Sequence, residues 1–121
     1  MKILIVDDNA SMRRMIRRII EPLGSEIYEC ADGGEALKIY TRVFPDWVLM
    51  DIQMKPVDGI RATRQIIRDY PQARILMVTN YNDNDLRQAA HEAGACQYLV
   101  KENLLDILNI LPGAYNAELS N

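Results

Sequence analysis

Short apolar runs alternate along this chain with longer segments in which apolar residues recur at helical spacing. The short runs have the length of β-strands, and they lie at 3–6, 27–30, 47–50, 75–78 and 97–100. Three of them are apolar throughout, which is typical of parallel strands that are covered on both faces. The pattern therefore predicts five strands separated by helices.

The segments between the runs predict amphipathic helices. In the first, apolar residues recur three and four positions apart, and Pro22 and Gly24 end the helix. Its apolar stripe consists of Met12, Met15, Ile16, Ile19, Ile20 and Leu23. Similar stripes lie within 36–44, 60–70, 86–93 and 104–111, and the last has Leu104, Ile107, Leu108 and Leu111 as its core positions.

Alternating strands and helices indicate βαβ units around one parallel sheet. Right-handed crossovers leave few arrangements, and the commonest is an open, doubly wound α/β sheet of order 2-1-3-4-5, the flavodoxin-like fold. We expect this domain over 1–112, followed by a polar tail or the start of a linker at 113–121. In such sheets the site lies beyond the carboxyl ends of the strands, between the first and the third.

Composition fits one domain and excludes several classes of protein. With 121 residues, 49% of them apolar, the chain can fill one core without disulfides or metals. Its apolar runs are too short for a transmembrane helix or a signal peptide, so we expect a cytoplasmic protein that does not bind membranes. A net charge of −3 disfavours direct nucleic-acid binding. Cys30 and Cys96 lie apart in apolar segments and are expected as reduced core thiols.

Acidic residues follow two of the predicted strands. Asp7 and Asp8 come directly after the first, and Asp51 directly after the third, so the fold would bring three carboxylates to one place. Like charges this close are costly without a cation, and oxygen-only ligands favour Mg²⁺ or Mn²⁺. Magnesium typically uses one or two carboxylates, which leaves a third free as a nucleophile. Asp51 is the better candidate because it stands alone at the end of a central strand.

The other two strand ends add a hydroxyl and a positive charge. Thr79 ends the fourth strand, and Lys101 follows the fifth. Three acids, one hydroxyl and one lysine at successive strand ends suit the transfer of a phosphoryl group to a carboxylate. In such a transfer Mg²⁺ and Lys101 would neutralise the phosphoryl oxygens while Asp51 attacks in line.

These residues stand in motifs that resemble the receiver domain of the two-component response regulators, the family of the chemotaxis response regulator. The motifs are ILIVDDN at 3–9, MDIQMKPVDG at 50–59, VTN at 78–80 and GACQYLVK at 94–101. The resemblance implies that Asp51 accepts a phosphoryl group from the phosphohistidine of a sensor kinase or phosphotransfer domain. It also implies that Asp7 or Asp8, Asp51 and the backbone carbonyl of Gln53 bind Mg²⁺.

The same resemblance implies a signalling switch and not an enzyme, beyond self-catalysed phosphoryl transfer and slow autodephosphorylation. Thr79 would move toward the new phosphoryl group, and Tyr98 would swing inward to fill the space vacated. The rival interpretation is a pseudo-receiver that acts only through protein contacts. Such domains typically lack one or more of the acids, and this chain has all three.

The acids also allow other interpretations. Asp7 and Asp8 could belong to an ordinary acidic turn before a helix that Asn9 or Ser11 caps. A haloacid-dehalogenase-type phosphatase would need a second Asp two residues after a nucleophile at the end of the first strand, where Asn9 stands. A flavodoxin-like cofactor binder would need a phosphate-binding loop in place of the two carboxylates.

The chain departs from the family pattern at three places. Lys55 stands where relatives usually have proline, and Pro56 follows one residue later. Asn80 is larger than the alanine common in relatives, which would narrow access for small phosphodonors. Lys101 precedes Glu102, where many relatives have a proline and a cis bond.

Two surfaces suggest partners. The outer face of the first helix is basic and could steer an acidic kinase, and it carries Arg13, Arg14, Arg17 and Arg18. Leu105 and Ile110 fall on the flanks of the fifth helix, where exposed apolar surface would serve self-association or contact with an output domain. The sequence leaves open whether the chain acts alone or belongs to a longer DNA-binding regulator.

Overall fold

The computed structural model of the protein describes residues 1–111, so the predicted tail at 113–121 lies outside the described residues. The strands are β1 (Lys2–Val6), β2 (Glu26–Cys30), β3 (Trp47–Met50), β4 (Ile75–Thr79) and β5 (Gln97–Val100). The α-helices are α1 (Ala10–Ile20), α2 (Gly33–Val43), α3 (Gly59–Asp69), α4 (Asn84–Ala93) and α5 (Ile107–Ile110). Two 3₁₀ segments, η1 (Glu21–Leu23) and η2 (Lys101–Asp106), complete the described chain.

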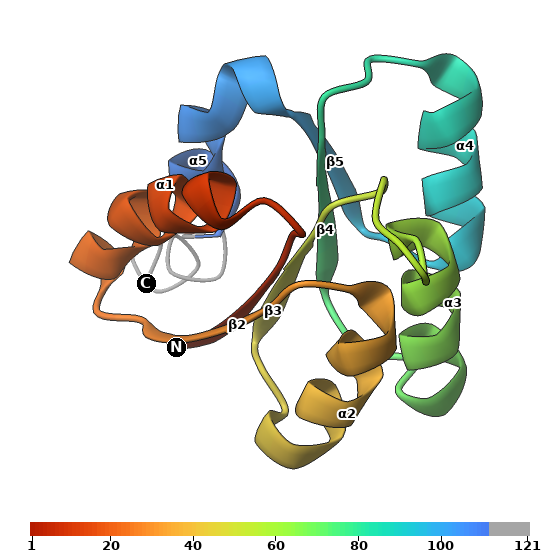
Figure 1. The fold of residues 1–121 in the computed structure, drawn as a ribbon, viewed down its shortest axis with the longest axis horizontal. Helices are drawn as coiled ribbons and strands as arrows, with labels where there is room; N and C mark the ends of the chain where they lie inside the picture. Colours follow the sequence, from red (N-terminus) through yellow and green to blue (C-terminus); the bar gives the residue numbers. More distant parts are fainter. Residues whose placement is uncertain (112–121) are drawn as a thin grey trace, which may run out of the picture.

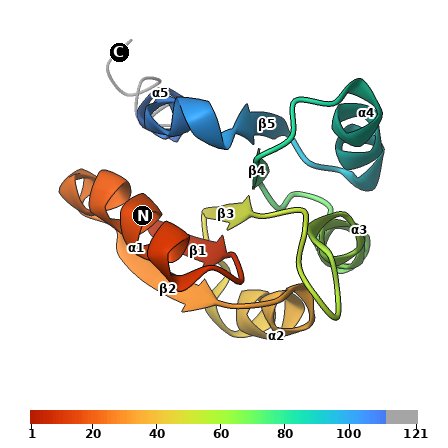
Figure 2. The ribbon, with the colours of Figure 1, turned by 45° about the horizontal axis from the view of Figure 1, so that its top comes forward.

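The strands form one parallel sheet of order β2-β1-β3-β4-β5, which confirms the predicted doubly wound fold. Figures 1 and 2 show α1 and α5 on one face of this sheet and α2, α3 and α4 on the other. The three central strands β1, β3 and β4 are buried on both faces after Lys2, as their continuous apolar runs predict. No described helix is long and apolar enough to cross a membrane.

Successive side chains of each strand enter opposite layers of the core, because a strand alternates its two faces. Leu4 and Val6 of β1 pack with Met50 and Ile66 beneath α2, α3 and α4. Ile3 and Ile5 pack in the other layer, with the buried stripe of α1 and with α5. The sheet is thereby held between two apolar layers that leave its strand ends open.

Local capping explains where the helices begin. Side-chain oxygens accept hydrogen bonds from the first-turn backbone N–H groups of four helices, which is the usual role of Asn and Asp at this position. The caps are Asn9 for α1, Asp32 for α2, Asp58 for α3 and Asp83 for α4. Of the two candidates for the cap of α1, the structure selects Asn9 and not Ser11.

The C-terminal helical segment differs from the prediction. The expected helix at 104–111 is divided between η2 and the single turn of α5. The buried positions of this segment are Leu104, Ile107 and Leu111, and Ile110 is half-buried. Leu108, expected in the core, is 38% exposed, and Ile110, expected on an exposed flank, packs against the core.

Three other expected core residues lie at the surface. Met15 is 52% exposed because the buried line of α1 runs through Ile16 and Ile20, and Met15 lies at its edge. Leu23 lies in η1, beyond the end of α1, and is also exposed. Cys96 precedes β5 and is exposed, so it is not the core thiol that its apolar neighbours predicted, whereas Cys30 is half-buried.

Candidate functional site

The three carboxylates converge at the carboxyl ends of β1 and β3. Val6 and Met50 are register partners, and the Asp51 N–H donates to the Val6 carbonyl at 2.9 Å, so Asp51 follows β3 directly beside the turn after β1. Asp7, Asp8 and Asp51 each offer an oxygen within 4.8 Å of the others. Asp7 and Asp51 are buried, and Asp8 is exposed. The arrangement is the one that the strand-end pattern predicted.

Lys101 reaches the same place from the end of β5. Its Nζ lies 2.9 Å from Asp7 Oδ2 and 3.4 Å from Asp51 Oδ1, and the lysine side chain is only 8% exposed. The ammonium thus bridges the two buried acids. A buried charge-assisted contact of this kind depends on good geometry, because both partners lose their hydration.

Asp51 is the acid with the most perturbed titration. The pKa of Asp51 is raised to about 6: burial is the largest cause, the charge of Asp7 acts in the same direction, and the nearby ammonium of Lys101 opposes both effects. At neutral pH the carboxylate is therefore mostly ionised, although the site disfavours its charge. A pKa close to neutrality in a cleft is a frequent property of a functional carboxyl.

Asp7 and Asp8 differ in whether their carboxylate oxygens are already hydrogen-bonded. The Asp7 carboxylate is fully engaged, since Oδ1 accepts from the Asn9 N–H at 2.9 Å and Oδ2 contacts Lys101. Within residues 1–111 the exposed Asp8 carboxylate accepts no hydrogen bond. Of the two, Asp8 is the acid whose oxygens are open to an ion from solvent.

These donors fit a hard divalent cation. All are oxygen, three of them lie within reach of one ion, and one borders solvent, so waters could complete an octahedron. Gln53 is exposed two residues after Asp51 and lines the same cavity as Asp8. The site therefore has the composition that Mg²⁺ prefers.

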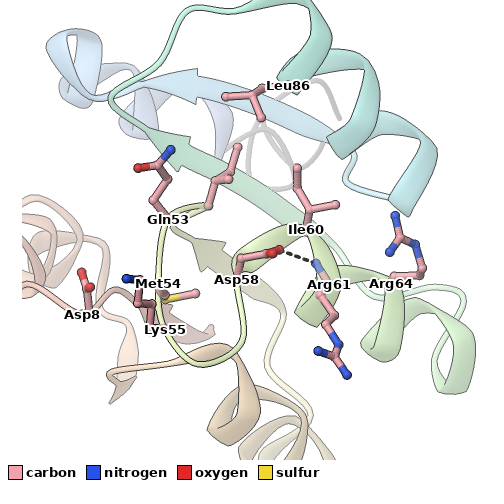
Figure 3. A pocket seen from close by; sticks show the side chains of 10 residues that line it. Asp8, Gln53, Met54, Lys55, Asp58, Ile60, Arg61, Arg64 and Leu86 are labelled. Carbon is pink, nitrogen blue, oxygen red and sulfur yellow. Dashed lines mark hydrogen bonds between the residues drawn. The ribbon is translucent and has the colours of Figure 1, made fainter.

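A cavity of about 790 Å³ opens beside the carboxylates, between the β3–α3 loop and helices α3 and α4 (Figure 3). Its lining includes Asp8, Gln53 and Lys55 at one end and Arg61 and Arg64 at the other. Lys55, one of the departures from the family pattern, is exposed on this loop. The Lys55–Pro56 bond is the cis bond of the described chain, and the Lys101–Glu102 bond is trans.

Gly59 holds the β3–α3 loop against the end of β3. Its N–H donates to the Ile52 carbonyl at 2.8 Å, and a Cβ at this position would lie 1.9 Å from the carbonyl oxygen of Asp51. Only glycine fits this close backbone approach. Sequence reasoning included Gly59 in a motif but assigned it no role, and the Asp58-Gly59 pair, a typical turn-forming dipeptide, was the available signal.

Thr79 and Tyr98 lie on neighbouring strands beside the acids. Thr79 is fully buried at the end of β4, and its Oγ1 accepts from the Tyr81 N–H at 3.3 Å. The half-buried Tyr98 donates its hydroxyl to the Tyr81 carbonyl at 2.6 Å, and the Arg87 guanidinium lies 4.5 Å from the centre of its ring. The backbone of Tyr81, through its N–H and its carbonyl, thus links the two side chains that were predicted to move together.

The basic face of α1 is only partly free. Arg13 and Arg17 both bind Glu29 of β2, at 3.0 and 2.7 Å, and Arg13 also donates to the Asp7 carbonyl. Arg14 and Arg18 remain exposed. Two of the four arginines that were expected to steer an acidic partner are therefore paired within the domain, because β2 lies beside the helix and supplies a carboxylate.

Comparison with known proteins agrees with this geometry. The family model of the response regulator receiver domain matches residues 3–111. The chemotaxis protein CheY of Bacillus subtilis is 38% identical over 113 residues, which cover 89% of this chain and 94% of that protein. The transcriptional regulatory protein LiaR of the same organism is 35% identical over 102 residues, which cover 83% of this chain but only 48% of LiaR.

A solved structure has a similar fold and a sequence identity close to that of LiaR. The crystal structure of a two-component response regulator of the LuxR family from Aurantimonas superposes with a TM-score of 0.89 at 34% identity, covering 96% of this chain and 85% of that one. The chain spans about half the length of LiaR and nearly all of CheY. On its family match, fold and strand-end residues, the chain belongs to the response regulator receiver domains of two-component signalling systems.

Proposed function

We propose that the protein is a phosphoacceptor switch in which Asp51 takes a phosphoryl group from the phosphohistidine of a sensor kinase or phosphotransfer domain. The observation that carries this proposal is the convergence of three carboxylates and the Lys101 ammonium at the ends of β1, β3 and β5. The presence of all these groups gives no support to the pseudo-receiver alternative.

Each residue has a distinct part in the proposed transfer. Asp51, ionised at neutral pH, attacks the phosphorus in line as the bond to the histidine nitrogen breaks and the imidazole leaves. Lys101 neutralises one phosphoryl oxygen, and the Thr79 hydroxyl donates to another. Asp8, Asp51 and the Gln53 carbonyl would hold Mg²⁺, with Asp7 fixed beside them. When bound, the ion neutralises charge on the phosphoryl oxygens.

The switch follows from the contacts of Thr79. Its Oγ1 now accepts from the Tyr81 N–H, so movement toward a phosphoryl group breaks this hydrogen bond and releases the backbone of Tyr81. Tyr98 is bound to the carbonyl of Tyr81 and would follow. One added charge at Asp51 is thereby coupled to the surface formed by α4 and β5.

In this proposal the switch acts through a protein contact on the surface formed by η2 and α5. Leu105 is 68% exposed and Leu108 is 38% exposed, so η2 and α5 present apolar surface to solvent. We propose that this surface serves self-association or contact with an output domain. A stand-alone switch resembles the chemotaxis protein CheY, and a domain of a longer regulator resembles the transcriptional regulatory protein LiaR.

The proposal is tested by incubating the protein with Mg²⁺ and acetyl phosphate and then measuring the intact mass. We expect a gain of one phosphoryl group, no gain when EDTA replaces Mg²⁺, and no gain in Asp51→Asn. Asp106→Asn is the matched control, because it removes the charge of an exposed acid in η2. Phosphorylation that persists in Asp51→Asn, or that never occurs with any acyl phosphate or phosphoramidate, would refute the assignment.

A further inference from the structure

We propose that Arg13 is a positioning residue for the magnesium site, acting through the backbone of Asp7. Its Nη1 donates to the Asp7 carbonyl at 2.6 Å, and its Nε donates to Glu29 Oε1 at 3.0 Å. The guanidinium therefore bridges the carboxyl end of β2 and the turn that carries the acids. This inference rests on the proposed function, since it assumes that the carboxylates bind Mg²⁺.

The Asp7 carbonyl matters because it belongs to the peptide unit that joins Asp7 to Asp8. A peptide unit is planar, so a hydrogen bond on its oxygen limits how the next residue can rotate. Asp8 is the exposed acid that accepts no hydrogen bond within the described chain. Its carboxylate can be directed toward Asp51 only by its backbone, and Arg13 holds that backbone.

The other polar groups of Asp7 are also hydrogen-bonded, so with the Arg13 bond to its carbonyl every polar group of this residue is held in place. Its N–H donates to the Cys30 carbonyl at 3.2 Å, and its carboxylate contacts the Asn9 N–H and Lys101 at 2.9 Å each. The bond from Arg13 is the shortest of these four. Without it, the Asp7–Asp8 peptide would have no side-chain restraint on its carbonyl.

Glu29 in turn holds Arg13 in place. Glu29 pairs with Ile5 in the register of β1 and β2, which places its carboxylate beside the β1–α1 turn. Its second oxygen accepts from Arg17 at 2.7 Å, and the side chains of Arg13 and Glu29 are only 20% and 25% exposed. The carboxylate also offsets the charge of Arg13, so the guanidinium orients Asp7 without strongly repelling a cation.

Two effects of Arg13 on Mg²⁺ affinity have opposite signs. Its positive charge opposes cation binding, and its hydrogen bond favours binding by keeping Asp8 in place. We expect the second to be larger, because groups that orient metal ligands typically contribute about 10- to 100-fold in affinity. Arg17 shares the same carboxylate but does not contact Asp7, so Arg17→Ala removes a comparable positive charge while the Arg13 bond to the Asp7 carbonyl stays in place.

The test is isothermal titration of the metal-free protein with MgCl₂ at constant ionic strength. We expect Arg13→Ala to weaken Mg²⁺ binding about tenfold, and Arg17→Ala to change it by less than about twofold. Glu29→Gln should weaken binding, but it should add nothing in the Arg13→Ala background because the two act as one unit. Arg13→Lys should have an Mg²⁺ affinity between those of wild type and Arg13→Ala, since one ammonium cannot contact both Glu29 and the Asp7 carbonyl as a guanidinium does.

A second measurement separates positioning from general stability. In the metal-free protein, amide hydrogen exchange at Asp8 and Asn9 should become faster in Arg13→Ala and stay unchanged in Arg17→Ala. Equal Mg²⁺ affinity in wild type and Arg13→Ala, or an equal loss in Arg17→Ala, overturns the inference and leaves the proposed function intact. If wild type itself does not bind Mg²⁺, both are wrong. If Arg13→Ala does not fold, the test uses Arg13→Lys and Glu29→Gln instead. Mg²⁺ affinity equal to that of wild type in both variants then overturns the inference.

Discussion

Replacing Asp51 by asparagine should stabilise the metal-free protein while it abolishes phosphorylation. The site disfavours the charge of Asp51, because the carboxylate is buried beside Asp7 and is only partly compensated by Lys101. Asparagine keeps the shape of the side chain and removes that charge. The same concentration of negative charge that would favour a bound cation therefore lowers the stability of the metal-free protein.

The size of the effect follows from the pKa of Asp51. Raising a pKa from 3.8 to about 6 disfavours the ionised folded state, and at about 1.4 kcal/mol per pKa unit the upper limit is about 3 kcal/mol. Solvent on the open side of the site screens part of this, so we expect a stabilisation of about 1–2 kcal/mol at pH 7.5.

The sign of the pH dependence is also determined. Between about pH 6 and pH 3.8 the folded wild type binds a proton at Asp51 that the unfolded chain does not, so the stability contributed by this group rises as the pH falls. The advantage of Asp51→Asn should therefore be largest above pH 6 and should shrink toward pH 4. Saturating Mg²⁺ should also reduce it, because the ion binds the folded wild type more tightly than the variant.

Urea denaturation followed by far-ultraviolet circular dichroism measures this prediction, in EDTA and in Mg²⁺. A stabilisation of this size moves the midpoint by about 1 M urea. Asp106→Asn controls for net charge and should change the free energy of unfolding by less than about 0.5 kcal/mol. An Asp51→Asn protein that is no more stable than wild type in EDTA at pH 7.5, or whose advantage does not depend on pH, would refute the reasoning.

Three further predictions concern other parts of the molecule. Lys101→Met should lower the free energy of unfolding in EDTA by about 3 kcal/mol, because Asp7 and Asp51 lose the ammonium that bridges them. It should also tighten Mg²⁺ binding in calorimetry, since the ammonium competes with the ion for the same carboxylates, and weaker binding would contradict this. Gly59→Ala should destabilise the protein by about 2 kcal/mol or more in urea and slow phosphorylation by acetyl phosphate, because its Cβ would lie 1.9 Å from the Asp51 carbonyl oxygen. An unchanged rate would show that the loop does not position Asp51. Leu105→Glu should reduce self-association of the phosphorylated protein in sedimentation velocity without loss of stability, because Leu105 is 68% exposed. Identical monomers for variant and wild type would exclude a dimer through this surface.

The C-terminal segment shows where prediction from periodicity stops. A helical period of 3.6 residues correctly placed Leu104, Ile107 and Leu111 in the core. It exchanged Leu108 and Ile110, and it did not predict that the segment is divided between η2 and α5. Helix type depends on how the segment packs after β5, and no local pattern in the sequence encodes that packing.

The sequence by itself determined the order of the sheet and the meeting of the acids. Continuous apolar runs specify buried parallel strands, the handedness of the crossovers limits their order, and residues that directly follow such strands must share one edge. Asp7, Asp51 and Lys101 could therefore be placed together before any coordinates, although they lie far apart in the chain.

Only the tertiary structure decided how these residues are held. It distinguished the engaged carboxylate of Asp7 from the open one of Asp8, and it showed that Arg13 is bound between Glu29 and the Asp7 backbone. Such contacts depend on distances of a few ångströms between segments that pack side by side, and a linear pattern carries no information at that scale. The strand order could be predicted because it follows from topology, whereas the working geometry of the site required the packing of α1 against the sheet.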